Sequence, residues 1–237
     1  MISSTVTNFL STLYPGHVRG LHLNMMPGTT SGATLKGLLA KTVPGLNYLI
    51  VDEEDREKDV LPFGFLLQET GYMHIQGTKP DTVGVGLSSS PLGLAAYILE
   101  KFSTWTNPAW RERSDGGLGG SHPISLDRML SNVMVYWVTN SITSSMRFYK
   151  ENLSEHDAVV GNARVKVPVG FTDCPHEIAR ASRFQLRGKY PDLVSFTTLN
   201  TGGHFTAMEV PSLLASDILN FVQLVEARTE RENKAEL

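Results

Sequence analysis

The chain has 237 residues, of which 41% are hydrophobic and 19% are charged, a balance typical of a globular protein. Its formal net charge of −3, without any basic run, gives no reason to expect a nucleic-acid partner or an anionic membrane surface. The single cysteine, Cys174, excludes an internal disulfide and is interpreted as a buried small residue rather than a nucleophile. No HExxH or paired Cys/His spacing predicts a metal site.

The first part of the chain predicts a helix and a strand. Residues 1–14 form the predicted amphipathic helix and residues 18–25 the strand, and helical stretches are expected over residues 33–70. The apolar side predicted for the first helix comprises Val6, Phe9, Leu10 and Leu13. A parallel sheet normally starts with strands, so this opening suggests that a segment is missing upstream.

The middle of the chain predicts mainly helices. Residues 77–84 predict a turn-rich connection, after which Pro91 begins a helix. Residues 116–123 predict a flexible surface loop, Ser125 caps the next helix, and residues 140–150 predict another. Because these helices lie between two strand-bearing parts, the layout predicts a helical lid inserted into an α/β core.

The last part of the chain carries the candidate catalytic residues. Residues 164–171 and 193–200 predict two further strands. The first is followed by two acids, Asp173 and Glu177, and the second by a glycine turn and His204. A lone turn histidine is often satisfied by the backbone, but strand, acid, helix, strand and histidine is the order of the back half of an α/β-hydrolase triad.

A helix is predicted immediately after this histidine. Thr206 and Glu209 have the spacing of a capping box, and Pro211 suits a first helical turn. The face expected to be buried comprises Leu214, Ile218, Phe221, Val222 and Val225.

Several motifs of other reaction classes are absent from the sequence. It contains no GxxxxGK[ST] phosphate loop and no GxGxxG segment after a strand. It also contains no GxSxG or GxDxG nucleophile elbow. The sequence therefore offers a candidate base and acid, but no nucleophile.

Several segments resemble the microsomal epoxide hydrolases, in the order that this family has them. The matching segments are residues 71–84, 90–106, 132–137, 147–152 and 202–205. Residues 13–24, Leu-Tyr-Pro-Gly-His-Val-Arg-Gly-Leu-His-Leu-Asn, look most like the insect branch, the juvenile hormone epoxide hydrolases. The likeness extends from the first residues to about residue 226.

The resemblance implies an α/β-hydrolase fold, here the C-terminal part of the parallel sheet with an inserted helical lid. It divides the chain into core residues 1–44, a lid of residues 45–160, and core residues 161–237. It also implies that three parts lie upstream of this sequence: the Gly-Gly-Asp-Trp-Gly elbow with the nucleophile, the oxyanion-hole segment, and an N-terminal membrane anchor. A location in the endoplasmic reticulum membrane is implied only through that anchor.

The resemblance also implies roles for individual residues. His204 matches the base that activates water, and Glu177 matches the acid that orients it, with Asp173 as a weaker candidate. Tyr72 and Tyr149 match the two lid tyrosines that hydrogen-bond the epoxide oxygen. The bland alternative for each tyrosine is a packed ring with a satisfied hydroxyl. No cofactor and no metal are implied, and the expected partners are a small lipophilic epoxide and water.

The expected function is therefore an epoxide hydrolase that converts lipophilic, juvenile hormone-like epoxides to diols through a covalent ester. In this form it is expected to be truncated and to lack the nucleophilic aspartate, so the activity of the chain itself stays open. The alternative is a catalytically inactive truncated paralogue that keeps the lid and binds apolar ligands. An esterase on the same fold is a third reading, which the missing serine elbow disfavours.

Overall fold

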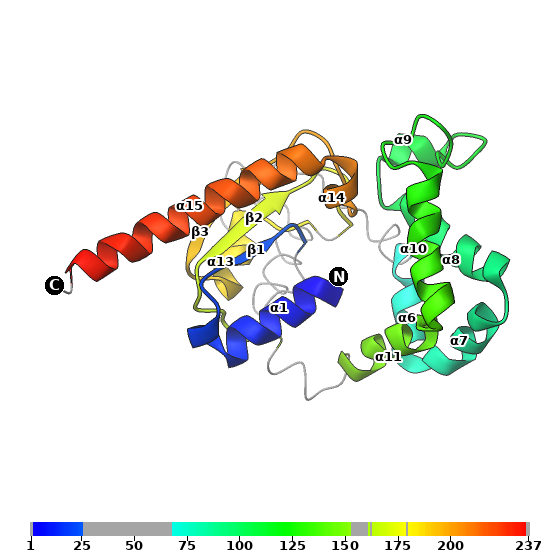
Figure 1. Ribbon diagram of the computed structural model, residues 1–237, viewed down its shortest axis with the longest axis horizontal. Helices are drawn as coiled ribbons and strands as arrows, with labels where there is room; N and C mark the ends of the chain where they lie inside the picture. Colours follow the sequence, from blue (N-terminus) through cyan, green and yellow to red (C-terminus); the bar gives the residue numbers. More distant parts are fainter. Residues whose placement is uncertain (1, 26–67, 153–160, 162, 179, 236–237) are drawn as a thin grey trace, which may run out of the picture.

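The computed structural model describes residues 2–25, 68–152, 161, 163–178 and 180–235. Figure 1 shows a small sheet with helices on both faces, and a separate group of helices beside it. The long helix α15 (Pro211–Ala235) covers one face of the sheet. Helices α1 (Ile2–Leu13) and α13 (Arg183–Lys189) lie on the other face.

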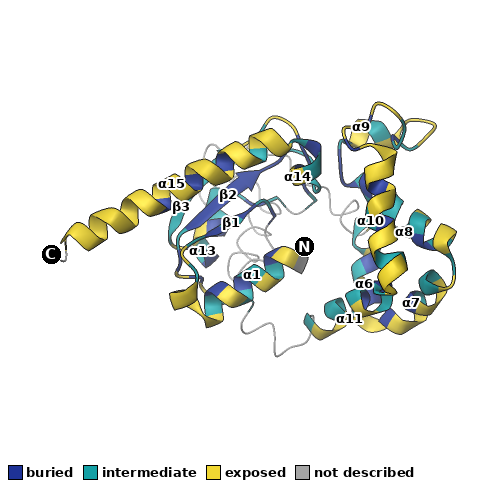
Figure 2. Cartoon of the chain, viewed as in Figure 1, coloured by how far each residue is buried: buried dark blue, intermediate teal, exposed yellow. Residues whose placement is uncertain are grey.

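The sheet has three parallel strands in the order β1-β2-β3. These strands are β1 (Leu21–Leu23), β2 (Val169–Asp173) and β3 (Leu193–Thr198). All five residues of the central strand β2 are buried, as Figure 2 shows in dark blue. Its side chains alternate between the two faces, so Val169 and Phe171 join the core cluster with Leu186 of α13.

The opposite face of β2 lies against α15 at very short range. A Cβ atom added to Gly170 would lie 2.7 Å from Cδ2 of Phe221, so only glycine fits between the strand and the helix. The two layers can therefore pack closely here, and this sets the depth at which α15 lies on the sheet.

The strand predicted over residues 164–171 is observed later in the chain, at Val169–Asp173. The cause is Pro168, which has no N–H to donate to the hydrogen-bond ladder of a central strand. Its carbonyl still accepts a hydrogen bond from the N–H of Leu21 (2.9 Å). Val165 and Val167 are buried all the same, but they lie outside regular pairing with β1 and β3.

The face predicted for α1 was wrong, and the face predicted for α15 was only partly right. Helix α1 buries Ser4, Asn8 and Ser11, whereas Leu10 and Leu13 of its apolar side are 46% and 56% exposed. The polar face is favoured because Asn8 Oδ1 accepts a hydrogen bond from the buried hydroxyl of Tyr190 (2.8 Å), and small serines allow close approach.

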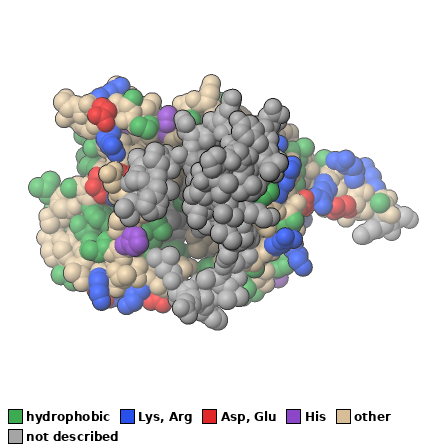
Figure 3. Space-filling model, turned by 180° about the vertical axis from the view of Figure 1, so that it is seen from behind, with side chains coloured by type: hydrophobic (Ala, Val, Ile, Leu, Met, Phe, Trp, Pro, Cys, Tyr) green, Lys and Arg blue, Asp and Glu red, His purple; other side chains and the backbone are tan. Residues whose placement is uncertain are grey.

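Helix α15 buries only part of its expected face, namely Phe221 and Val225. Its buried residues are Asp217, Phe221 and Val225, spaced four apart, while Ile218 and Val222 are 36% and 39% exposed. The polar Asp217 takes a core position because the hydroxyls of two sheet threonines and a histidine bind it there. The projecting end of the helix carries exposed charged side chains, which Figure 3 shows gathered together.

The helical part lies between β1 and β2 in the sequence. It contains α6 (Gly71–Thr78), α7 (Pro80–Ser88), α8 (Pro91–Thr104), α9 (Pro108–Arg111), α10 (Leu126–Thr139) and α11 (Ile142–Asn152). Caps define three of the starts: Ser90, Asn107 and Ser125 each accept a backbone N–H with the side chain. Two core clusters hold these helices together, one around Leu94 and Met146 and the other around Phe102.

Two predictions for this part need correction. The turn-rich connection expected over residues 77–84 is helical, because Pro80 begins α7 at a first-turn position where no N–H is needed. Gly84, read as a turn residue, is a helix contact point: a Cβ there would lie 2.4 Å from Oγ1 of Thr143 on α11. The loop at 116–123 is not a plain surface loop, since His122 is buried and its Nδ1 accepts from the N–H of Ile124 (3.0 Å).

Some expectations fall on residues that the structure does not describe. The helical stretches of residues 33–70 lie almost entirely outside the described residues, as does the boundary between residues 44 and 45. Within the described part, no single helix is long and apolar enough to cross a membrane, and α7 with α8 meet that test only together, across a bend of 119°.

Candidate functional site

His204 lies in a tight turn at the carboxyl end of the sheet. Strand β3 ends at Thr198, and two glycines then reverse the chain. Gly202 has φ of +96°, in the left-handed region that favours glycine, and a Cβ on Gly203 would lie 2.8 Å from the carbonyl oxygen of Trp105. The N–H of His204 donates to this same carbonyl (2.9 Å), so the histidine is anchored to the end of α8.

Glu177 is the acid that the structure brings to this histidine. Its carboxylate oxygens lie 2.9 and 3.1 Å from Nδ1 of His204, and its side chain is only 1% exposed. The two loops that carry the pair are joined by a bridge between His176 and Gly203. An Nδ1–H donated to a carboxylate fixes the tautomer and leaves Nε2 as the atom able to accept a proton.

Asp173, the weaker candidate for the acid, is bound elsewhere. Its two carboxylate oxygens accept hydrogen bonds from Nε and a terminal nitrogen of Arg180, at 3.0 and 2.8 Å. This bidentate ion pair is nearly buried, since the Asp173 side chain is 1% exposed. Glu177 is therefore the acid paired with His204, and Asp173 stabilises the loop that follows β2.

Tyr72 and Tyr149 come together in the helical part, from α6 and α11. Their ring centroids are 5.8 Å apart, and their hydroxyls are hydrogen-bonded to each other. Burial raises the pKa of Tyr72 strongly and raises the pKa of Tyr149 to about 12. Both side chains are therefore protonated at neutral pH and are able to donate hydrogen bonds.

Trp105 connects the tyrosines to the histidine, and no pattern in the sequence indicated this role. Its ring lies edge-to-face against the imidazole of His204, with centroids 5.0 Å apart, and 4.9 Å from the ring of Tyr72. It follows the last turn of α8, where a large aromatic residue is easily taken for part of the helix core. No spacing rule relates it to a histidine almost a hundred residues later, so only the fold reveals the contact.

Glu209 was predicted as part of a capping box with Thr206, but its side chain binds the backbone of the loop that carries His204. The two residues lie together in the short helix α14 (Thr206–Glu209). The Glu209 carboxylate accepts the N–H groups of Gly203 (3.1 Å) and Phe205 (3.0 Å), the residues on either side of His204. Burial raises its pKa to about 7, and the nearby charge of Glu177 acts in the same direction.

Cys174 is a buried residue of the core, as expected. It is 0% exposed, and its Sγ lies 3.2 Å from Oγ1 of Thr206. Burial raises the pKa of the thiol to about 11, which disfavours the thiolate that a nucleophile needs. Among the described residues, no group of three or more His, Cys, Asp or Glu side chains is arranged to hold a metal ion.

Comparison with known proteins finds relatives that are named as epoxide hydrolases. No family model matches the chain. It is 49% identical over 224 residues to epoxide hydrolase 1 from Oryctolagus cuniculus, which covers 92% of this chain and 48% of the relative. It is 40% identical over 240 residues to juvenile hormone epoxide hydrolase 1 from Ctenocephalides felis, covering 99% and 51%. The chain thus spans about half the length of the curated relatives it matches.

Solved structures agree with these relatives. The juvenile hormone epoxide hydrolase from the silkworm Bombyx mori superposes with a TM-score of 0.86 at 39% identity, over 95% of this chain and 53% of that one. An enantioselective mutant of the epoxide hydrolase from Aspergillus niger gives a TM-score of 0.66 at 25% identity, over 94% and 50%.

Proposed function

We propose that this chain, a homologue of the epoxide hydrolases that shares their α/β-hydrolase fold, supplies the base, the acid and the ring-opening donors of an epoxide-hydrolysing site. The observation that carries the proposal is the hydrogen-bonded Glu177–His204 pair. Across Trp105 it faces two protonated tyrosines. The helices α6 to α11, which bring these tyrosines, would serve as the lid.

The tyrosine pair suits the first half of the reaction. Opening the strained ring of an epoxide leaves negative charge on its oxygen, and a donor aimed at that oxygen stabilises the charge as it develops. The hydroxyls of Tyr72 and Tyr149 remain protonated at neutral pH, so they can donate without first being lost as anions. One of them would transfer its proton to the alkoxide as the ring opens.

The histidine pair suits the second half of the reaction. A carboxylate that attacks a ring carbon forms an ester and splits a difficult hydrolysis into two steps. Nε2 of His204 would then draw a proton from water, and the resulting hydroxide attacks the ester carbonyl. The buried carboxylate of Glu177, 2.9 Å from Nδ1, stabilises the imidazolium that forms.

No residue of this chain is assigned as the attacking carboxylate. The 237 residues contain no GxDxG or GxSxG segment, while each identified carboxylate near the histidine already has another task. We therefore propose that the chain by itself completes no turnover, and that the ester-forming carboxylate must come from sequence outside it. Without that carboxylate, the chain would bind apolar epoxides without hydrolysing them, which is the alternative function.

The substrate class is proposed from the relatives' names. Several of them are juvenile hormone epoxide hydrolases, and the wall formed by Trp105, Tyr72 and Tyr149 is aromatic. A lipophilic epoxide is therefore the proposed substrate, with water as the second reactant and without a cofactor. A microsomal location, at the endoplasmic reticulum membrane, is the corresponding proposal for the cell.

The test joins the 237 residues to the N-terminal half of the Bombyx mori enzyme and measures diol formation from a radiolabelled juvenile hormone. We expect the fused protein to form diol, and the 237-residue chain alone to form none. His204→Ala and the double change Tyr72→Phe with Tyr149→Phe should each abolish formation. His74→Ala, at an exposed position on α6, is the matched control that should not.

Two outcomes would contradict the proposal. Turnover by the 237-residue chain alone would show that a residue within it attacks the epoxide. A folded fused protein that binds the hormone but forms no diol would instead favour the binding function.

A further inference from the structure

We propose that the indole N–H of Trp105 is a ligand-binding donor, which holds a second oxygen atom of the substrate beside His204. The proposal deepens the proposed function, on which it rests, because it takes the ligand to be the lipophilic epoxide of that site. It assigns the ligand a further feature, an uncharged acceptor such as an ester carbonyl or ether oxygen.

The starting observation is a buried donor without an acceptor. Trp105 is 6% exposed, and its Nε1 has no hydrogen-bond partner among the residues that the structure describes. Leaving such a donor unpaired in a protein interior is unfavourable, so buried indole N–H groups usually meet a partner. A ligand that brings an acceptor to this position would remove that penalty.

The ring cannot turn to satisfy its N–H within the protein. The imidazole of His204 and the ring of Tyr72 contact it at centroid distances of 5.0 and 4.9 Å. The ammonium of Lys101 lies 5.3 Å from the centroid of the indole ring. The backbone carbonyl of Trp105 accepts the N–H of His204. The indole ring is therefore held between the proposed base and the proposed ring-opening tyrosine.

The surroundings define the chemistry of the partner. Aromatic rings of Tyr72 and Phe205 flank the indole, which favours an apolar ligand body. The ammonium of Lys101 disfavours a cationic ligand. An indole N–H can only donate, so the partner atom must be an acceptor. A lipophilic molecule with one oxygen acceptor outside the reacting ring fits all three conditions.

Binding of two matched ligands to the full 237-residue chain tests the proposal without requiring turnover. The ligands are a medium-chain methyl ester and the hydrocarbon of equal length, measured by equilibrium dialysis. We expect the chain to bind the ester about 10-fold more tightly. Trp105→Phe, which keeps an aromatic ring and removes the N–H, should abolish this preference and leave hydrocarbon binding nearly unchanged. Trp110→Phe is the control that should keep the preference.

A spectroscopic measurement on folded protein guards against a variant that does not fold. The chain has three tryptophans, so the double change Trp110→Phe with Trp137→Phe leaves Trp105 as the only indole. The ester should shift the emission of Trp105 to longer wavelength than the hydrocarbon does.

Equal binding of the two ligands to the unaltered chain, or an ester preference that survives Trp105→Phe, would overturn the proposal. Either result would mean that the indole N–H does not bind the oxygen of the ligand. An ester preference in a site whose fused protein forms no diol would instead overturn the proposed hydrolysis and leave the binding role of Trp105 intact.

Discussion

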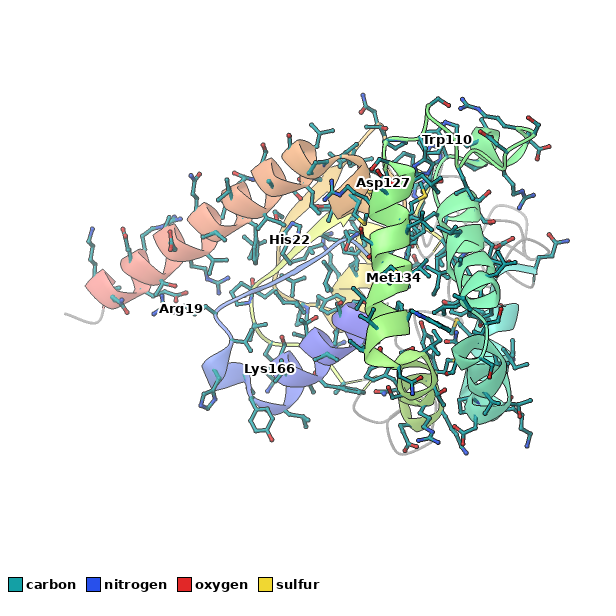
Figure 4. The ribbon with its side chains drawn as sticks, turned by 45° about the vertical axis from the view of Figure 1, so that its right-hand side comes forward. Arg19, His22, Trp110, Asp127, Met134 and Lys166 are labelled. Carbon is teal, nitrogen blue, oxygen red and sulfur yellow. The ribbon has the colours of Figure 1, made fainter. Side chains whose placement is uncertain are left out.

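The described part of the chain contains two histidine–carboxylate pairs of nearly equal length and different surroundings. His204 binds Glu177 through Nδ1 at 2.9 Å, and His22 binds Asp217 through Nε2 at 3.0 Å. His22 is labelled in Figure 4. The second pair is enclosed: Thr172 and Thr197 also donate to Asp217, and Phe221 packs on the His22 ring. The first pair faces an aromatic wall instead. Distance alone does not distinguish a reactive pair from a structural one, whereas the remaining partners do.

The largest expected effect separates the two pairs by activity. In the fused protein, His204→Ala should lower diol formation at least about 10³-fold, because it removes the proposed base that accepts the proton from water. His22→Asn should leave the rate per folded molecule unchanged. Radiometric diol assays, corrected for the folded fraction by circular dichroism, compare the two. Equal losses would mean that the enclosed pair takes part in the reaction.

The His22–Asp217 pair should matter for stability, although it is expected not to matter for activity. Asp217→Ala removes hydrogen bonds to the buried Thr172 and to the partly buried His22 and Thr197, and we expect it to lower the free energy of unfolding by about 3 kcal/mol. Urea unfolding followed by circular dichroism gives this value. Glu226→Gln on the exposed side of α15 is the control and should change little. A small effect at Asp217 would show that its partners rearrange to satisfy one another.

The pH dependence of stability should show the titration of Glu209, whose carboxylate binds the loop that carries His204. The pKa of Glu209 is raised in the folded protein to about 7 from its ordinary value of 4.5. Between these values the folded state binds more protons than the unfolded state, so this group's contribution falls as pH rises from 4.5 to 7. Urea midpoints at pH 5, 6 and 7 should therefore fall more steeply in the unaltered chain than in Glu209→Gln.

His22 should contribute with the opposite sign. Burial lowers its pKa from the ordinary 6.5, so its contribution to stability is lost as pH falls below 6.5. His22 contributes equally to the unaltered chain and to Glu209→Gln. The difference between their slopes therefore reports the contribution of the Glu209 carboxyl alone. Identical slopes would show that Glu209 is ionised throughout.

The smallest effect on stability is expected from a change at Ile218, the residue next to Asp217. Ile218 is 36% exposed on the outer side of α15, so Ile218→Ala should lower the free energy of unfolding by less than about 0.5 kcal/mol. Phe221→Ala, at a buried position of the same helix, should lower it by about 3–5 kcal/mol. Urea unfolding of both variants checks which face packs on the sheet, and similar losses would restore the face predicted from periodicity.

The parts of the site that the sequence predicted are those signalled by neighbouring residues. A β-prone run, two glycines and a histidine lie together in the chain, and Glu177 follows the preceding strand, so both loops could be located. The parallel order of the strands then brings their carboxyl ends to one edge. Tyr72 and Tyr149 were found only through family resemblance, because nothing local marks a tyrosine as a donor.

The parts that could not be predicted depend on partners far along the chain. Periodicity indicated the apolar side of α1, but Asn8 is buried because of a hydroxyl on Tyr190. Asp217 takes a core position because His22 and two threonines surround it. Trp105 meets His204 only after the helical part has folded against the sheet. Hydrophobic patterning ranks faces by polarity and carries no information about such polar partners.

The position of the helical part between β1 and β2 also determines the order in which the protein can fold. Val169 pairs with Leu193 across a short connection, but Leu21 must pair with Val169 across the whole helical segment. The entropy of closing a loop grows only with the logarithm of its length, so the insertion weakens the final fold little. Contacts of such long sequence separation nevertheless form slowly. During synthesis, the edge of β1 that pairs with β2 stays unpaired until β2 has emerged.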